Sequence, residues 1–126
     1  MSLQMIHHVQ ITFPATAEAE ARAFYCDFLG LPEIEKPDSL KTRGGFWVRL
    51  GAQEIHLSRE DGVNRQATKA HIAYAVQDVW AWQEKIIAYG LKVADSVPIP
   101  GYNRFEFRDP FGNRVEFIER ITTQEQ

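Results

Sequence analysis

The chain consists of two half-length repeats that share one order of secondary-structure elements. Each half opens with a strand rich in β-branched residues, continues with an amphipathic helix and a short strand, and closes with a hairpin. The expected elements cover residues 5–13, 17–29, 31–35, 46–50 and 53–58 in the first half and 70–76, 79–89, 92–94, 104–108 and 114–119 in the second. The segment Phe28-Leu29-Gly30-Leu31 matches Ala88-Tyr89-Gly90-Leu91 at an offset of 60 residues. The order β-α-β-β-β therefore occurs twice, which indicates a paired-module domain and not a solenoid.

The repeat predicts an α+β fold in one domain, residues 1–126, with module one at about 5–60 and module two at about 69–120. Alternation gives every strand one bulky apolar face, which the helices have to cover. We therefore expect a cupped, mostly antiparallel sheet with helices on its outer face and a partly polar concave face. Asp78 precedes the second helix and is the expected N-cap.

Composition narrows the class of function. The net charge is −3 and no run of Lys or Arg forms a basic stripe, which argues against nucleic acid as a partner. No apolar run approaches transmembrane length, and no basic-then-apolar leader opens the chain, so we expect no membrane association. The single cysteine, Cys26, fits a reducing compartment, and the expected location is the cytoplasm.

Four potential metal ligands occupy matching places in the repeats. His71 follows His8 by 63 residues, near the start of each half, and Glu116 follows His56 by 60, near the end of each half. Alternation places all four on the more polar face of their strands. Imidazole nitrogens and carboxylate oxygens are ligands of divalent first-row metals, so the pattern predicts a site for Ni, Zn, Mn or Fe, with the identity open.

Further residues are expected on or near the same concave face. Trp47 and Arg49 join it by alternation, as does Arg104, and Tyr102 lies in the bordering loop 96–103; these four are the candidate substrate contacts. Loop 36–45 is expected to border the face as well, and loops of this kind carry specificity. His7 neighbours His8 but should point to the opposite face, so it is expected to have no metal role.

With these residues in place, the chain resembles the vicinal oxygen chelate superfamily. That superfamily includes glyoxalase I, bleomycin-resistance proteins, fosfomycin-resistance thiol transferases, methylmalonyl-CoA epimerase and extradiol dioxygenases. The similarity runs from about Ile6 to Glu119. The motifs that carry it are Ile6-His7-His8-Val9, Ala23-Phe24-Tyr25, Glu54-Ile55-His56-Leu57, Ala70-His71-Ile72-Ala73 and Asp109-Pro110-Phe111-Gly112-Asn113-Arg114-Val115-Glu116-Phe117.

The resemblance implies roles for the four ligand candidates. His8, His71 and Glu116 match ligands that metal-dependent members share, whereas His56 stands where glyoxalase I has a glutamate and the epimerase a glutamine. Three neutral imidazoles and one carboxylate would leave a divalent ion with a net charge of about +1, which makes it a stronger Lewis acid. Glu116 and His56 are the expected catalytic residues, and His56 is either a ligand or a base. Glu54 and Glu106 are possible substitute bases.

Three functions follow from the resemblance. The first is a metal-dependent glyoxalase-like lyase or isomerase, which chelates vicinal oxygens of a small substrate and stabilises an enediolate. The second is an extradiol-type Fe(II) dioxygenase with a two-histidine-one-carboxylate face. The third is a thiol transferase or a binding protein that confers resistance to a toxic small molecule. Relatives often pair their modules across a dimer, so a homodimer with sites shared between chains is expected.

Overall fold

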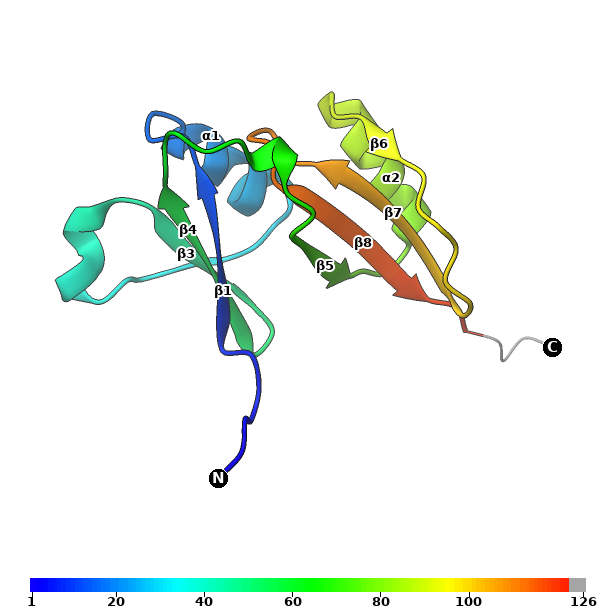
Figure 1. The fold of residues 1–126 in the computed structure, drawn as a ribbon, viewed down its shortest axis with the longest axis horizontal. Coiled ribbons are helices and arrows are strands. Elements are labelled where there is room, and N and C mark those ends of the chain that lie inside the picture. The colour runs from blue at the N-terminus through cyan, green and yellow to red at the C-terminus, as the bar shows by residue number, and fades with distance from the viewer. Residues whose placement is uncertain (123–126) are drawn as a thin grey trace. The chain divides into compact units, whose positions relative to one another are not determined.

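The computed structural model describes residues 1–122, and the chain divides into two compact units between Val63 and Asn64 (Figure 1). Each unit contains one four-stranded mixed sheet and follows the β-α-β-β-β order that the repeat predicts. The α+β class and the two modules are thereby confirmed. No helix within residues 1–122 has the length and apolar character needed to cross a membrane.

Unit one forms a sheet in the order β1-β4-β3-β2, in which β1 and β4 are parallel and the other pairs antiparallel. Parallel pairing of the first and last strands requires a crossover, which the helical segment supplies. The elements are β1 (His8–Phe13), α1 (Glu18–Arg22), the π-helix η1 (Ala23–Phe28), β2 (Glu33–Ile34), the 3₁₀ helix η2 (Asp38–Arg43), β3 (Phe46–Leu50) and β4 (Gln53–Arg59).

Unit two repeats this topology with the order β5-β8-β7-β6, and again the first and last strands pair in parallel. Its elements are the 3₁₀ helix η3 (Arg65–Ala67), β5 (His71–Ala75), α2 (Val79–Tyr89), β6 (Val93–Ala94), β7 (Tyr102–Arg108) and β8 (Arg114–Arg120). The boundaries of α2 agree with the expected range, and the strands differ from theirs by a few residues.

The helix of unit one changes its winding part of the way along. The sequence predicts one continuous helix over 17–29, but from Ala23 onward the turns widen, and the Leu29 amide donates to the Phe24 carbonyl at 2.9 Å. Phe24 and Tyr25 are both fully buried although they are consecutive. A wider turn brings neighbouring side chains closer to one face, and this accommodates two adjacent aromatic rings.

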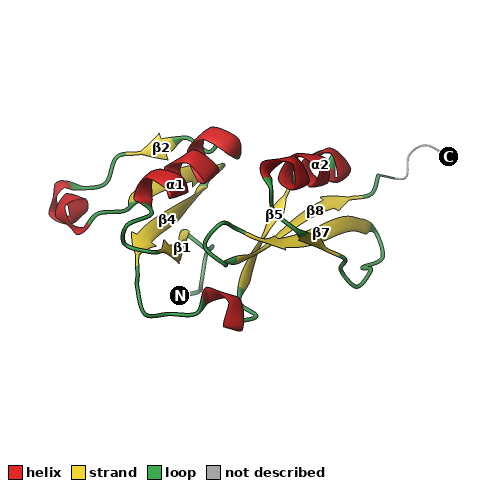
Figure 2. Cartoon of the chain, turned by 90° about the horizontal axis from the view of Figure 1, so that it is seen from above, coloured by secondary structure: helices red, strands yellow, loops and turns green. Residues whose placement is uncertain are grey.

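Each unit buries the bulky apolar face of its sheet beneath its own helix (Figure 2). In unit two the Phe117 ring lies edge-on to Tyr74, Trp82, Phe105 and Phe107. The core of unit one contains Phe13, Phe24, Tyr25, Phe46, Val48, Ile55 and Leu57. Burial of each such side chain contributes about 1.5–3 kcal/mol. The predicted ligands therefore lie on the face that these cores do not use.

The N-terminus of α2 is capped from another strand. Asp78 stands at the N-cap position, as predicted, but it has a left-handed backbone (φ 57°) and its side chain makes no capping hydrogen bond. An N-cap residue needs an extended backbone, which Asp78 lacks. The Glu119 carboxylate on β8 instead accepts the amides of Asp78 and Val79, both at 2.9 Å. These bonds hold the pKa of Glu119 below its usual value.

Candidate functional site

The face of the unit-one sheet that carries His8 and His56 lines a cavity of about 550 Å³. Strands β1, β3 and β4 supply one wall, and the segment between β2 and β3 supplies the other. The lining residues are His8, Gln10, Lys36, Leu40, Arg43, Gly44, Trp47, His56, Ser58 and Arg59. Two predicted ligands and the predicted substrate contact Trp47 therefore share one cavity.

Three aromatic rings stack on this wall. Trp47 and His56 are directly opposite in the β3–β4 register, and their rings lie 3.7 Å apart at 1°. The His8 ring stacks on the other side of His56 at 4.0 Å and 13°. His56 is buried, and this desolvation holds its pKa below the usual value, although a hydrogen bond to Glu54 acts in the opposite direction. A lowered pKa favours the neutral imidazole, which is the form that binds metals.

Glu54 and His7 are close partners of the two histidines. The Glu54 Oε1 lies 3.0 Å from His56 Nε2, a bond that holds the pKa of Glu54 below its usual value. Carboxylates in this position orient metal-binding imidazoles. The His7 Nδ1 lies 3.0 Å from His8 Nδ1, with the rings edge to face. Our expectation that His7 points to the opposite face is wrong, because His7 precedes β1 and strand alternation does not apply there.

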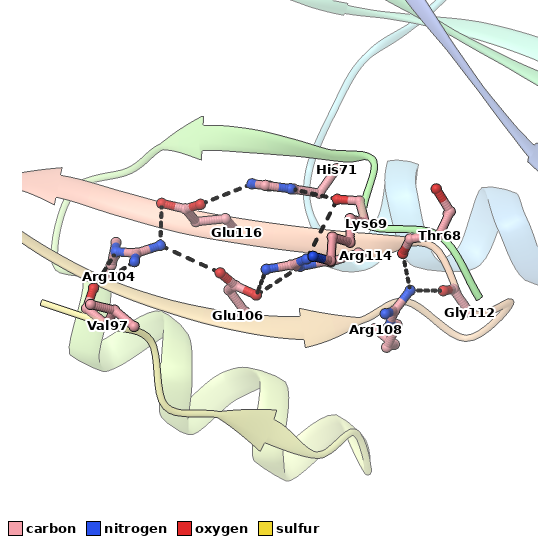
Figure 3. A network of polar contacts seen from close by, with 10 residues as sticks. All are labelled: Thr68, Lys69, His71, Val97, Arg104, Glu106, Arg108, Gly112, Arg114 and Glu116. Carbon is pink, nitrogen blue, oxygen red and sulfur yellow. Dashed lines mark hydrogen bonds and ion pairs between the residues drawn. The ribbon is translucent and has the colours of Figure 1, made fainter. Parts of the chain in front are cut away.

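In unit two, His71 and Glu116 are in direct contact (Figure 3). The His71 Nδ1 lies 3.0 Å from the Lys69 carbonyl oxygen, which accepts hydrogen bonds only, so Nδ1 carries the proton. The His71 Nε2 lies 3.1 Å from Glu116 Oε1. An imidazole nitrogen and a carboxylate oxygen are both ligands of divalent first-row metals, so the chemistry of this pair fits such an ion.

Glu116 also belongs to a carboxylate–guanidinium network. Glu106 and Glu116 are directly opposite in the β7–β8 register, where like charges repel. The Arg104 Nη1 lies 3.2 Å from Glu116 and 3.4 Å from Glu106, and Arg114 contacts Glu106 at 2.8 Å (Figure 3). Arg104 also donates to the Val97 carbonyl oxygen. Arg104 therefore neutralises a pair of largely buried carboxylates.

The remaining predicted substrate contacts lie apart from the unit-one cavity lining. Arg49 is exposed, with its guanidinium 3.9 Å from Glu54. Tyr102 stands at the start of β7, where its hydroxyl accepts from Arg120 at 3.2 Å and its ring lies beneath that guanidinium. Of the four predicted contacts, Trp47 lines the cavity, and the roles of the other three stay predictions.

Each unit brings two of the four predicted ligands together: His8 with His56, and His71 with Glu116. Within residues 1–122, no group of three or more His, Cys, Asp or Glu side chains is arranged to hold a metal ion.

The structure adds cavity residues that the sequence left without individual roles. Lys36 and Arg43, together with Leu40 between them, line the unit-one cavity from the segment that was expected to border the concave face. Three cations, Lys36, Lys41 and Arg43, occur within this short stretch. This concentration of positive charge is the sequence signal that could have indicated a functional role for the segment.

Comparison with known proteins identifies the family. Residues 5–117 match the model of the Glyoxalase/Bleomycin resistance protein/Dioxygenase superfamily, and the chain belongs to it. No functionally curated protein matches the chain. The family membership confirms the resemblance that the motifs indicated.

Solved structures agree with this assignment. A protein from Bacillus anthracis assigned to the glyoxalase family is 43% identical, with 96% of this chain and 98% of that chain covered and a TM-score of 0.86. A glyoxalase/dioxygenase from Nostoc punctiforme shares 19% identity, with 94% and 92% covered and a TM-score of 0.77. The fosfomycin resistance protein FosX from Listeria monocytogenes, complexed with Mn(II) and sulfate, shares 19% identity, with 98% and 94% covered and a TM-score of 0.75. The last two show likeness of fold.

Proposed function

We propose that this protein is a metal-dependent glyoxalase-like lyase or isomerase that acts on a small substrate with two vicinal oxygens. The ligands are His8 and His56 from unit one and His71 and Glu116 from unit two, around one Ni, Zn, Mn or Fe ion. The observation that carries the proposal is the His71–Glu116 contact, in which an imidazole nitrogen and a carboxylate oxygen, both metal-ligand types, lie 3.1 Å apart. The bound ion supplies Lewis-acid stabilisation of the charge that develops on the two oxygens.

The chain's own residues orient the donors and move the proton. Glu54 positions the His56 ring, and the Lys69 carbonyl positions the His71 ring. Arg104 fixes one oxygen of Glu116, which leaves the other directed at His71. His56 or Glu116 accepts the proton from the carbon beside the vicinal oxygens and returns it. Arg49 and Tyr102 are further proposed substrate contacts.

Elemental analysis after reconstitution with each of the four metals tests the ligand set. We expect about one ion per chain, and loss of binding in His71→Ala and Glu116→Ala. Glu84→Ala is the matched control, since it removes an exposed carboxylate on α2 that is not among the proposed ligands. Absence of any bound metal refutes the proposal, and normal affinity in either ligand variant refutes the assignment of that residue.

The reaction class is tested with the metal-loaded protein. We expect no sustained oxygen uptake with catechols under Fe(II), and uptake would favour the extradiol dioxygenase instead. Transfer of a thiol to a substrate, or tight binding of a toxic compound without turnover, would favour a resistance protein. Isomerisation or lyase turnover of a 2-oxoaldehyde adduct, lost in Glu116→Gln, supports the proposal.

We also propose a homodimer in which each site takes ligands from two chains, as relatives in this superfamily often do. One chain carrying His8→Ala with His56→Ala is mixed with a second carrying His71→Ala with Glu116→Ala. Neither chain binds metal alone, but a mixed dimer with shared sites regains one intact site. We expect the mixture to regain about a quarter of the wild-type metal content under random pairing. No recovery refutes sharing between chains, and a monomer in sedimentation analysis does the same.

A further inference from the structure

The unit-one cavity has an unbalanced charge. The cations Lys36, Arg43 and Arg59 are among the residues that line it, whereas no Asp or Glu is. A wall of this composition raises the local concentration of anions and disfavours cationic ligands. The overall charge of the chain is negative, so this positive region is local to the cavity.

The partners of these cations show which charges remain available. Arg59 is already paired, because its Nη2 lies 3.0 Å and its Nε 3.1 Å from Glu18 Oε1. Lys36 donates to the Gly44 carbonyl oxygen at 2.6 Å, a contact that fixes its position without neutralising its charge. Within residues 1–122, the Arg43 side chain has no ion pair or hydrogen bond. Lys36 and Arg43 therefore present two uncompensated positive charges.

The opposite wall adds a neutral donor. Ser58 donates its hydroxyl to Gln10 Oε1 at 3.1 Å, which leaves the Gln10 amide NH₂ group directed to other acceptors. Gln10 and Ser58 line the same cavity as His8, His56 and Trp47. Its volume of about 550 Å³ is within the range of small-molecule sites. The lining thus combines two free cations, an amide donor and a flat aromatic surface.

We propose that Lys36 and Arg43 bind an anionic group of the substrate, so that the substrate class is a small organic oxyanion, a carboxylate or a phosphate ester. This inference rests on the proposed function for the reacting end of the molecule, near His8 and His56. The charged end lies at the segment that contains η2, where a guanidinium and an ammonium form charge-assisted hydrogen bonds to oxyanions. Arg49 and Arg104, the two arginines among the candidate substrate contacts, each contact a carboxylate of the protein itself, whereas Lys36 and Arg43 do not.

Titration of the EDTA-treated full chain with inorganic phosphate and, separately, with acetate tests the inference without a metal. Binding is followed by two-dimensional NMR, using the Trp47 indole N–H and the Gly44 amide. We expect saturable shifts at both signals with at least one of the two anions, and the stronger anion distinguishes a phosphate ester from a carboxylate. Arg43→Gln and Lys36→Gln each weaken binding by about tenfold or more.

Lys41→Gln is the matched control. Lys41 is on the same 3₁₀ helix, η2, as Arg43. It forms ion pairs with Asp38 and Glu35, however, and is not among the cavity-lining residues. We expect it to bind both anions as the wild type does. Because the Arg43 side chain makes no hydrogen bond or ion pair within residues 1–122, Arg43→Gln is expected to fold normally, which its unchanged NMR spectrum outside the cavity checks.

Two results overturn the inference: wild-type affinity in Arg43→Gln, or equal weakening in Lys41→Gln, which would indicate diffuse charge attraction. The result is separable from that for the proposed function. Anion binding by a protein that takes up no metal supports this inference and refutes the metal site. Metal uptake without any anion binding refutes this inference and supports the metal site.

Discussion

Arg104 separates two carboxylates that face each other across β7 and β8, so its removal should destabilise the fold. The side chains of Arg104, Glu106 and Glu116 are 13%, 16% and 7% exposed, which makes this a largely buried cluster. Loss of one partner from a buried ion pair costs about 3–5 kcal/mol. Because Arg114 still contacts Glu106, we expect the lower end, about 3 kcal/mol, for Arg104→Met.

The assay is urea unfolding of EDTA-treated protein, followed by far-UV circular dichroism, since a bound cation would also neutralise Glu116. A loss of about 3 kcal/mol corresponds to a fall in Tm of roughly 10 °C for a chain of this size. Arg104→Lys keeps the positive charge, so we expect it to lose less than half as much stability as Arg104→Met. Arg120→Met removes an exposed arginine from the next strand and is expected to change stability by less than about 0.5 kcal/mol.

A double variant isolates the repulsion between the carboxylates. Glu106→Gln added to Arg104→Met removes one of the two charges, and we expect it to recover about 1 kcal/mol or more relative to Arg104→Met alone. The reasoning is refuted if Arg104→Met loses less than about 1 kcal/mol, or if the double variant is no more stable than the single one.

Three further predictions concern stability. The amides of Asp78 and Val79 lower the pKa of the Glu119 carboxyl, so the ionised carboxylate stabilises the fold above pH 4.5, the usual pKa of the unfolded chain. This stabilisation is lost as the pH falls through the lower pKa of the folded state. In Glu119→Gln the free energy of unfolding should no longer show this part of the decrease at acid pH. Gly45→Ala should destabilise by about 2 kcal/mol more than Gly51→Ala in urea unfolding, because at Gly45 (φ 78°) the new Cβ would overlap the Leu57 carbonyl oxygen whereas the space at Gly51 is open. Tyr74→Phe should leave the free energy of unfolding unchanged or raise it by up to about 1 kcal/mol, because the buried Tyr74 hydroxyl has no hydrogen-bond partner in the described residues. A decrease in stability of more than about 1 kcal/mol would show that the hydroxyl does have a partner.

The fold was largely predictable because the signals for it are local. Strand alternation and the Gly90 stop, which has a left-handed backbone, are properties of short sequence windows. The repeat then fixes the order of elements twice. The contacts between distant residues were not predictable: Asp78 stands at the N-cap position of α2, but the side chain that caps the helix is Glu119 of β8.

The candidate site was predictable in part for the same reason. The alternation of side chains along a strand predicted that His56 and Trp47 lie on the same face of the sheet, and the β3–β4 register places them directly opposite each other. The neighbours of each group were not predictable, because a strand pattern does not give the partner strand's register. The contacts of Arg104 with Glu106 and Glu116 are an example, and its expected contact with a substrate stays a prediction. Lys36 and Arg43 were missed because a loop has no periodicity from which to infer what it faces.

Parallel pairing of the first and last strands in each unit has a consequence for the order of folding. Ile11 pairs with Leu57, and Tyr74 with Phe117, so each sheet is complete only when its final strand has left the ribosome. Such non-local pairing slows folding compared with hairpins alone. Unit one, however, already contains both partners of its parallel pair before unit two begins, and domains synthesised first generally fold first. Synthesis from the N-terminus therefore lets the first half close before the strands of the second half are available to pair with it.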